Sequence, residues 1–169
     1  MCNSNRMVTK PVLALEWSMK RSLVTYVTGM SDGSVTATAG AMVGGDGFIF
    51  PGVAPEADGE QTSDGQPWSH HRTLRFTGSV SFAGHSGMLR LMIAEPWLEQ
   101  DPSAHGVWHL TITDPYDPGQ RLSFAQVAGF DPDGAALSCT LSADGADLFM
   151  AGPYESGTPL DLPRIRAND

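Results

Sequence analysis

Short segments of alternating polar and apolar residues, separated by frequent turns, constrain the fold of this chain most. Its 169 residues include 19 Gly and 12 Pro, which break a chain into short elements. Strand-like runs occur at residues 34–39, 47–51, 72–84, 88–94, 106–113, 121–128 and 135–141. Seven short strands with turn signals between them predict a mostly β fold, either a β-sandwich or an open barrel of antiparallel strands.

The run at 72–84 alternates most clearly and predicts a hairpin with the run at 88–94. Its apolar positions Leu74, Phe76, Val80 and Phe82 share one face of a strand. Gly78 interrupts them and marks a bulge or a close approach of another segment. The turn Ser86-Gly87 then leads into the second strand.

Two helices are expected. Residues 15–28 place Leu23, Tyr26 and Val27 on one apolar stripe, with Tyr26 in the last turn and Gly29 ending the helix. A short helical turn is expected after Ser142, which is a typical N-cap residue. Residues 1–10 are predicted to form a flexible leader, residues 11–169 a single domain, and the chain beyond Gly152 is predicted to be irregular.

Charge and composition exclude several classes of partner. The formal net charge is −9, so a phosphate backbone would repel the protein and nucleic acid is not an expected partner. No run approaches the 18 or so apolar residues that span a membrane, so membrane insertion is not expected. The polar N-terminus lacks a secretion signal. The sequence as it stands therefore predicts a cytoplasmic protein, or a secreted or cell-surface one if a signal has been removed.

Several residue patterns invite a functional interpretation that the local sequence does not favour. Cys2 and Cys139 lie in a tail and a strand, which does not favour a disulfide. Gly84-His85-Ser86-Gly87 departs from the nucleophile elbow because Gly directly follows Ser. His105 and His109 lie four residues apart, which is about 13 Å in a strand and too far for one metal ion. On residue pattern alone, Tyr26 is a core residue of its helix.

Three segments resemble the HtaA domain of actinobacterial haem-uptake proteins. They read LEWSMKRSLVTYVTG at 15–29, LRFTGSVSFAGHSGML at 74–89, and LSADGADLF at 141–149 followed by YESGTPLD at 154–161. Each is similar to a family motif, and together they follow the family's order and spacing. The resemblance extends from about residue 13 to residue 163.

The resemblance implies a haem-binding protein with ferric haem as cofactor. Carried over position by position, the axial ligand falls on Tyr26, and the histidine that supports it falls on His85. Tyr154 matches a second tyrosine of the family's haem pocket. The implied role is haem capture, buffering or hand-over, without catalysis, with haem donor or acceptor proteins as candidate partners.

The lining of such a pocket and two rival functions stay open at this point. Leu23, Phe82, Met88 and Met92 are candidates for packing against the macrocycle, and Lys20, Arg75 and Arg90 for meeting the propionates. One rival is a non-haem module that binds a carbohydrate or a protein ligand through exposed tryptophans. The tryptophans considered for that role are Trp68, Trp97 and Trp108. The other rival is an enzyme that modifies haem or hydrolyses a substrate through His85.

Overall fold

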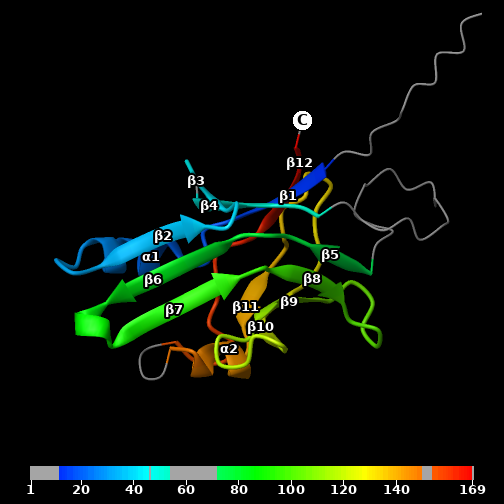
Figure 1. Ribbon diagram of the computed structural model, residues 1–169. Helices are drawn as coiled ribbons and strands as arrows, with labels where there is room; N and C mark the ends of the chain where they lie inside the picture. The colour runs from blue at the N-terminus through cyan, green and yellow to red at the C-terminus, as the bar shows by residue number, and fades with distance from the viewer. Residues whose placement is uncertain (1–11, 46, 54–71, 150–153, 169) are drawn as a thin grey trace, which may run out of the picture.

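The computed structural model describes residues 12–45, 47–53, 72–149 and 154–168 (Figure 1). The predicted leader at 1–10 lies outside the described residues. The helical elements are α1 (Arg21–Thr28), the 3₁₀ turn η1 (His85–Gly87) and α2 (Ala143–Asp147). The strands are β1 (Val12–Trp17), β2 (Ser34–Thr38), β3 (Met42–Gly44), β4 (Gly47–Pro51), β5 (Thr73–Arg75), β6 (Ser79–Gly84), β7 (Leu89–Ala94), β8 (Trp97–Gln100), β9 (Trp108–Thr113), β10 (Arg121–Val127), β11 (Cys139–Leu141) and β12 (Arg164–Asn168).

The strands form three sheets around one apolar core. Their orders are β12-β1-β4-β3, β11-β10-β9-β8-β5 and β2-β6-β7, and every pairing between strands in the described ranges is antiparallel. One cluster of buried side chains draws on all three sheets, including Phe50, Ile93 and Ile112, each of which is fully buried. The predicted mostly β architecture with an N-terminal helix and a short C-terminal helix is confirmed.

The predicted helix at 15–28 is wrong over its first half. Val12–Trp17 forms β1, and only Arg21–Thr28 is helical. β1 pairs with β12 on one side and β4 on the other, so the buried side chains of Leu13, Leu15 and Trp17 point into the core at strand spacing. Long-range strand pairing therefore overrides a local periodicity that also suits a helix.

The long predicted strand at 72–84 is divided into β5 and β6 at Gly78. The φ of Gly78 is +103°, and a Cβ there would lie 2.6 Å from the Cβ of Ala41, so the predicted close approach is confirmed. Leu74, Phe76, Val80 and Phe82 are all buried, as the alternation predicts. β6 and β7 form the predicted hairpin.

Besides β1, three further strands were not predicted. They are β3, β8 and β12, and β12 lies in the segment after Gly152 that was expected to be irregular. β12 pairs along the sheet edge with β1, a contact that spans the whole chain, and it also forms a bridge from Arg164 to Ala135. The predicted N-cap of α2 is confirmed, because the Ser142 Oγ accepts a hydrogen bond from the Gly145 amide at 2.9 Å.

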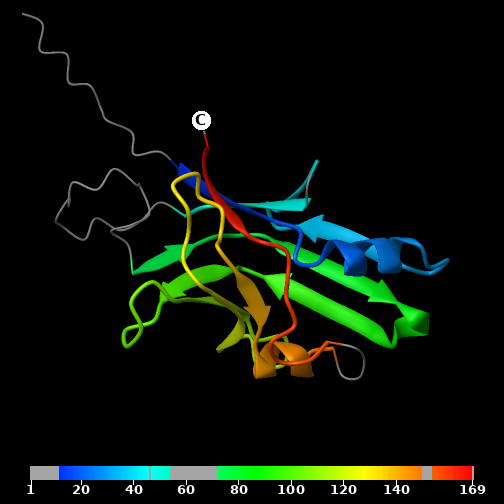
Figure 2. The ribbon, with the colours of Figure 1, turned by 180° about the vertical axis from the view of Figure 1, so that it is seen from behind.

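Helix α1 and the η1 turn lie at the same end of the molecule. Figure 2 shows α1 beside β2, with η1 at the far end of the β6–β7 hairpin. This end of the molecule therefore brings together the segment 15–29, which contains α1, and the segment 74–89, which contains η1. No helix in the described ranges is long and apolar enough to cross a bilayer.

Candidate functional site

Tyr26 lies on the exposed side of α1. Leu23 and Val27 are buried, whereas 54% of Tyr26 is exposed. The helix therefore turns its apolar stripe into the core at Leu23 and Val27, and leaves the phenol at the surface. The sequence pattern, which put Tyr26 on the buried stripe, was wrong at this residue.

His85 meets Tyr26 across the end of the sheet. The Tyr26 phenol oxygen lies 2.6 Å from the His85 Nε2, and the ring centroids are 5.6 Å apart. Both residues are exposed, and a phenol oxygen that hydrogen-bonds one partner keeps a lone pair for a second. The resemblance named these two residues, and the structure brings them into direct contact.

The η1 turn presents His85 in a conformation that a non-glycine residue seldom adopts. The φ angles of His85 and Ser86 are +50° and +55°, both left-handed. The turn leads into the strand β7 rather than into a helix, so Gly84–Gly87 is not a nucleophile elbow. The prediction of a hairpin turn is confirmed.

Tyr154 is partly buried and contacts α1 through a hydrogen bond with Ser22. Its ring packs on Phe149, with centroids 4.6 Å apart. Burial raises the pKa of the Tyr154 phenol; a hydrogen bond with Ser22 opposes this rise, and the charge of Tyr26 adds to it. Burial therefore disfavours the phenolate form of Tyr154, whereas Tyr26 is more exposed.

The candidate lining residues divide into two groups. Leu23 and Phe82 are buried in the core, so their predicted availability to a macrocycle is wrong. Met88 and Met92 are 85% and 40% exposed, and Met88 directly follows η1.

Of the three candidate residues for the propionates, two have partners elsewhere and one lies beside η1. Lys20 donates to the Pro159 carbonyl oxygen at 2.9 Å, and the Arg75 guanidinium stacks on Trp97 at 4.5 Å. Arg90 is exposed, and its Nη2 lies 3.9 Å from the position that a Cβ on Gly87 would occupy. Arg90 is thus the one of the three placed beside η1.

The two candidate tryptophans in the described ranges, Trp97 and Trp108, do not form an exposed binding platform. Trp108 is only 5% exposed and packs edge-on against Phe130, so its predicted exposure is wrong. Trp97 is covered by the guanidinium groups of Arg75 and Arg121, at 4.5 and 3.9 Å. Trp68 lies outside the described residues. The structure therefore gives the carbohydrate-module alternative no support from Trp97 or Trp108.

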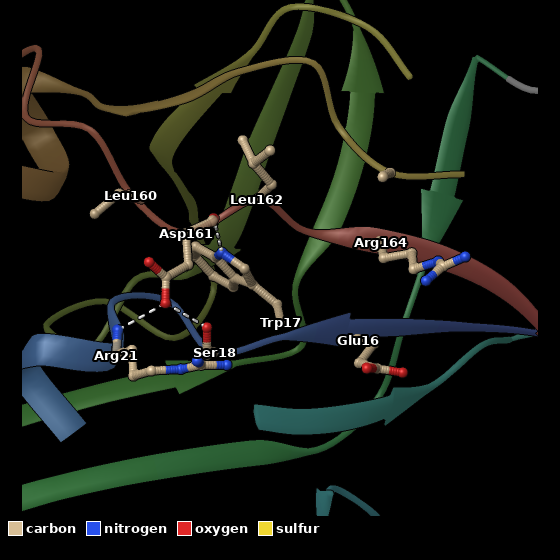
Figure 3. A pocket seen from close by; sticks show the side chains of 9 residues that line it. Glu16, Trp17, Ser18, Arg21, Leu160, Asp161, Leu162 and Arg164 are labelled. Atoms are coloured by element: carbon tan, nitrogen blue, oxygen red, sulfur yellow. Dashed lines mark hydrogen bonds between the residues drawn. The ribbon is translucent and has the colours of Figure 1, made fainter. Parts of the chain in front are cut away.

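Asp161 is a structurally important residue that residue-by-residue reasoning missed. Its carboxylate accepts hydrogen bonds from the Ser18 hydroxyl at 2.6 Å and the Arg21 amide at 2.7 Å, and its carbonyl accepts from the Trp17 indole at 2.8 Å (Figure 3). These contacts line a cleft of 540 Å³ between β1 and the segment before β12. Asp161 is the last residue of the motif at 154–161, and this position in the family motif was the one indication in the sequence that it matters.

A second cleft, of 440 Å³, lies between α1, β2 and the turn joining β3 to β4. Neither of these two clefts is lined by Tyr26 or His85. The second cleft lies on a different side of α1 from Tyr26, because Val24 and Thr28 line that cleft whereas Tyr26 contacts His85. The phenol–imidazole pair therefore lies outside both of these clefts.

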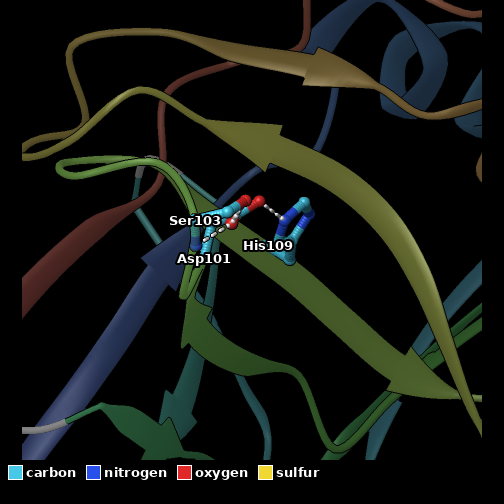
Figure 4. A network of polar contacts seen from close by, with 3 residues as sticks. All are labelled: Asp101, Ser103 and His109. Carbon is cyan, nitrogen blue, oxygen red and sulfur yellow. Dashed lines mark hydrogen bonds and ion pairs between the residues drawn. The ribbon is translucent and has the colours of Figure 1, made fainter.

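A second histidine belongs to a network that holds a loop. The Asp101 carboxylate accepts from His109 at 2.8 Å and from the Ser103 hydroxyl at 2.7 Å (Figure 4). The bonds from His109 and then Ser103 lower the pKa of Asp101 well below its usual range. Ser103 donates to Asp101 and not to His109, so the three residues lack the nucleophile–base contact of a catalytic triad. No group of three His, Cys, Asp or Glu suited to a metal occurs in the part of the chain described.

The fold and the exposed contact between Tyr26 and His85 define a mostly antiparallel β protein with a phenol–imidazole site at one end. The chain belongs to the HtaA family, whose model matches residues 13–165. This family is associated with haem, and the resemblance seen in the three motifs is confirmed.

Solved structures agree with the family. The C-terminal domain of HtaA from Corynebacterium glutamicum is similar with a TM-score of 0.68 and 22% identity, and 93% of this chain and 96% of that one are covered. The N-terminal domain of HtaA from the same organism gives a TM-score of 0.66 and 25% identity, with the same coverage of both chains. Comparison with curated proteins gave no match.

Proposed function

We propose that this chain binds ferric haem with Tyr26 as the axial ligand to the iron and His85 as its hydrogen-bonding support. The observation that carries the proposal is the 2.6 Å contact between an exposed phenol oxygen and an imidazole nitrogen, in a member of a haem-associated family. The proposed role is haem capture, buffering or hand-over to another protein, without turnover.

The donor set suits ferric iron. A phenolate is a hard, anionic oxygen donor, and tyrosine is an established axial ligand of haem. A free phenol has a pKa near 10, so the positive charge of the iron must stabilise the deprotonated form. A phenolate oxygen can only accept hydrogen bonds, so His85 donates its Nε2 proton to it and orients the ligand. The bound haem would supply a ferric centre with one axial position filled by the protein.

Tyr154 supports this arrangement without competing for the iron. Burial raises the pKa of the Tyr154 phenol and so disfavours the phenolate form that an iron ligand requires. Its ring and that of Phe149 provide an aromatic surface next to α1. We therefore assign Tyr154 to the wall of the site and Tyr26 to the iron.

Haemin titration of the purified protein tests the proposal. Wild-type protein is expected to give a tyrosinate-type ferric spectrum, and Tyr26→Phe to weaken binding by about tenfold or more, because a metal ligand is lost. Tyr116→Phe is the matched control, since Tyr116 is 74% exposed and lies in a distant turn. Equal haemin affinity of wild type and Tyr26→Phe would reject the assignment. Product formation from bound haem on adding a reductant would instead favour the enzyme alternative.

A further inference from the structure

The loop after α1 is tied to the η1 turn by the side chain of Asp32. The Asp32 carboxylate accepts a hydrogen bond from the Ser86 amide at 2.6 Å, across 54 positions of sequence. A hydrogen bond from an amide to a charged carboxylate is stronger than one between neutral groups. The residue that precedes this amide is His85.

The η1 turn needs such support. His85, Ser86 and Gly87 have φ angles of +50°, +55° and +87°, and the first two are non-glycine residues in a conformation that side chains disfavour. Backbone conformations of this kind persist only where the surroundings hold them. Among the hydrogen bonds of the described residues, the one to the Asp32 carboxylate reaches the middle of the turn from outside the hairpin.

The same loop also contacts the part of α1 that carries Tyr26. A Cβ on Gly33 would lie 1.7 Å from the Val27 carbonyl oxygen, and a Cβ on Gly84 would lie 2.8 Å from the Met30 Cε. Gly33 and Gly84 thus let the loop pack tightly against the helix end on one side and the start of η1 on the other. The loop bridges the two elements that supply the phenol and the imidazole.

We propose that Asp32 is a positioning residue for the Tyr26–His85 pair, which it aligns by holding the Ser86 amide. The hydrogen bond from the Ser86 amide to Asp32 supports the positioning of His85. The importance of this positioning for haem binding rests on the proposed function. Asp32 is exposed, so its effect comes from this one hydrogen bond rather than from packing.

The first test needs no haem. In wild-type protein, nuclear Overhauser contacts are expected between the Tyr26 and His85 rings, and Asp32→Ala is expected to abolish them. Asp32→Asn retains an acceptor oxygen and is expected to keep part of their intensity. Asp114→Ala is the matched control, because Asp114 also accepts one backbone amide, that of Tyr116 at 2.9 Å, far from the site. Unchanged ring contacts in Asp32→Ala would overturn the proposal. If that variant does not fold, ring contacts of full wild-type intensity in Asp32→Asn would overturn it instead.

The second test uses haemin and a double-mutant cycle. If Asp32 acts through His85, Asp32→Ala weakens haemin binding by no more than His85→Ala does, and adds nothing in the His85→Ala background. Additive losses would overturn the positioning role. If wild type binds no haemin but Asp32→Ala still abolishes the ring contacts, the proposed function fails and the positioning role stands.

Discussion

The phenol of Tyr26 and the imidazole of His85 come from segments 59 residues apart. Burial of Leu23 and Val27 fixes the side of α1 on which Tyr26 stands, and the left-handed η1 turn fixes His85. Periodicity alone placed Tyr26 in the core. The candidate ligand could be named only from the motif resemblance, because single-residue exposure depends on which strands pack under the helix.

Removing the imidazole should weaken the site without removing the iron ligand. We expect His85→Ala to lower haemin affinity by about tenfold, the lower end of the effect of lost supporting groups, because the phenolate loses its hydrogen-bond donor. The tyrosinate-type spectrum should persist, since Tyr26 remains. Haemin titration followed by visible absorption checks both expectations. The affinity of His85→Gln, whose amide N–H can donate, should fall between those of wild type and His85→Ala. A spectrum without tyrosinate features in His85→Ala would contradict the supporting role of His85, because it would show that Tyr26 does not ligate the iron without the imidazole.

Helix α1 has no capping residue of its own at its start. Lys20 occupies the N-cap position and makes no side-chain cap, and the carboxylate of Asp161 takes its place, 140 positions away from the Arg21 amide. This distant cap explains why the start of the helix was predicted too early. The sequence between β1 and α1 contains no recognisable N-cap residue to separate the strand from the helix, because the capping carboxylate comes from the far end of the chain.

Loss of this distant cap should destabilise the protein. We expect Asp161→Ala to lower the free energy of unfolding by about 1–2 kcal/mol, as for other N-cap substitutions, because the Ser18 hydroxyl and Arg21 amide both lose an acceptor. Chemical denaturation measures the change. Asp133→Ala, at an exposed turn residue, is the control and should have little effect. Equal stability of Asp161→Ala and wild type would show that the cap is not needed.

At the scale of the whole molecule, turn frequency and two-residue periodicity were sufficient to predict the fold class. Both of these signals are local in sequence, and they were enough to predict the hairpin formed by β6 and β7. The order of strands in each sheet and the pairing of β1 with β12 depend on partners distant in sequence, so local patterns could not give them. The strands β3 and β8 are three and four residues long, which is too short for a two-residue period to mark them. The three sheets enclose one core, and Cys139 lies inside it, 2% exposed.

The thiol of Cys139 reports on the integrity of this core. Burial, and secondarily the charge of Asp161, raise the pKa of Cys139 to about 12. At pH 8 only about one thiol in ten thousand is then ionised, against about one in four for a free cysteine. We expect Cys2→Ser protein, which keeps Cys139 alone, to resist iodoacetamide in its folded state and to react after denaturation. Mass spectrometry measures the labelling, and rapid reaction of the folded protein would contradict a closed core.

Resonance Raman spectroscopy of the ferric haemin complex tests the central claim most directly, because it detects the bond between iron and a phenolate oxygen. We predict iron–tyrosinate and phenolate ring modes in wild type and in Tyr116→Phe, and their absence in Tyr26→Phe. A wild-type complex without these modes, or one whose modes survive in Tyr26→Phe, would contradict the account.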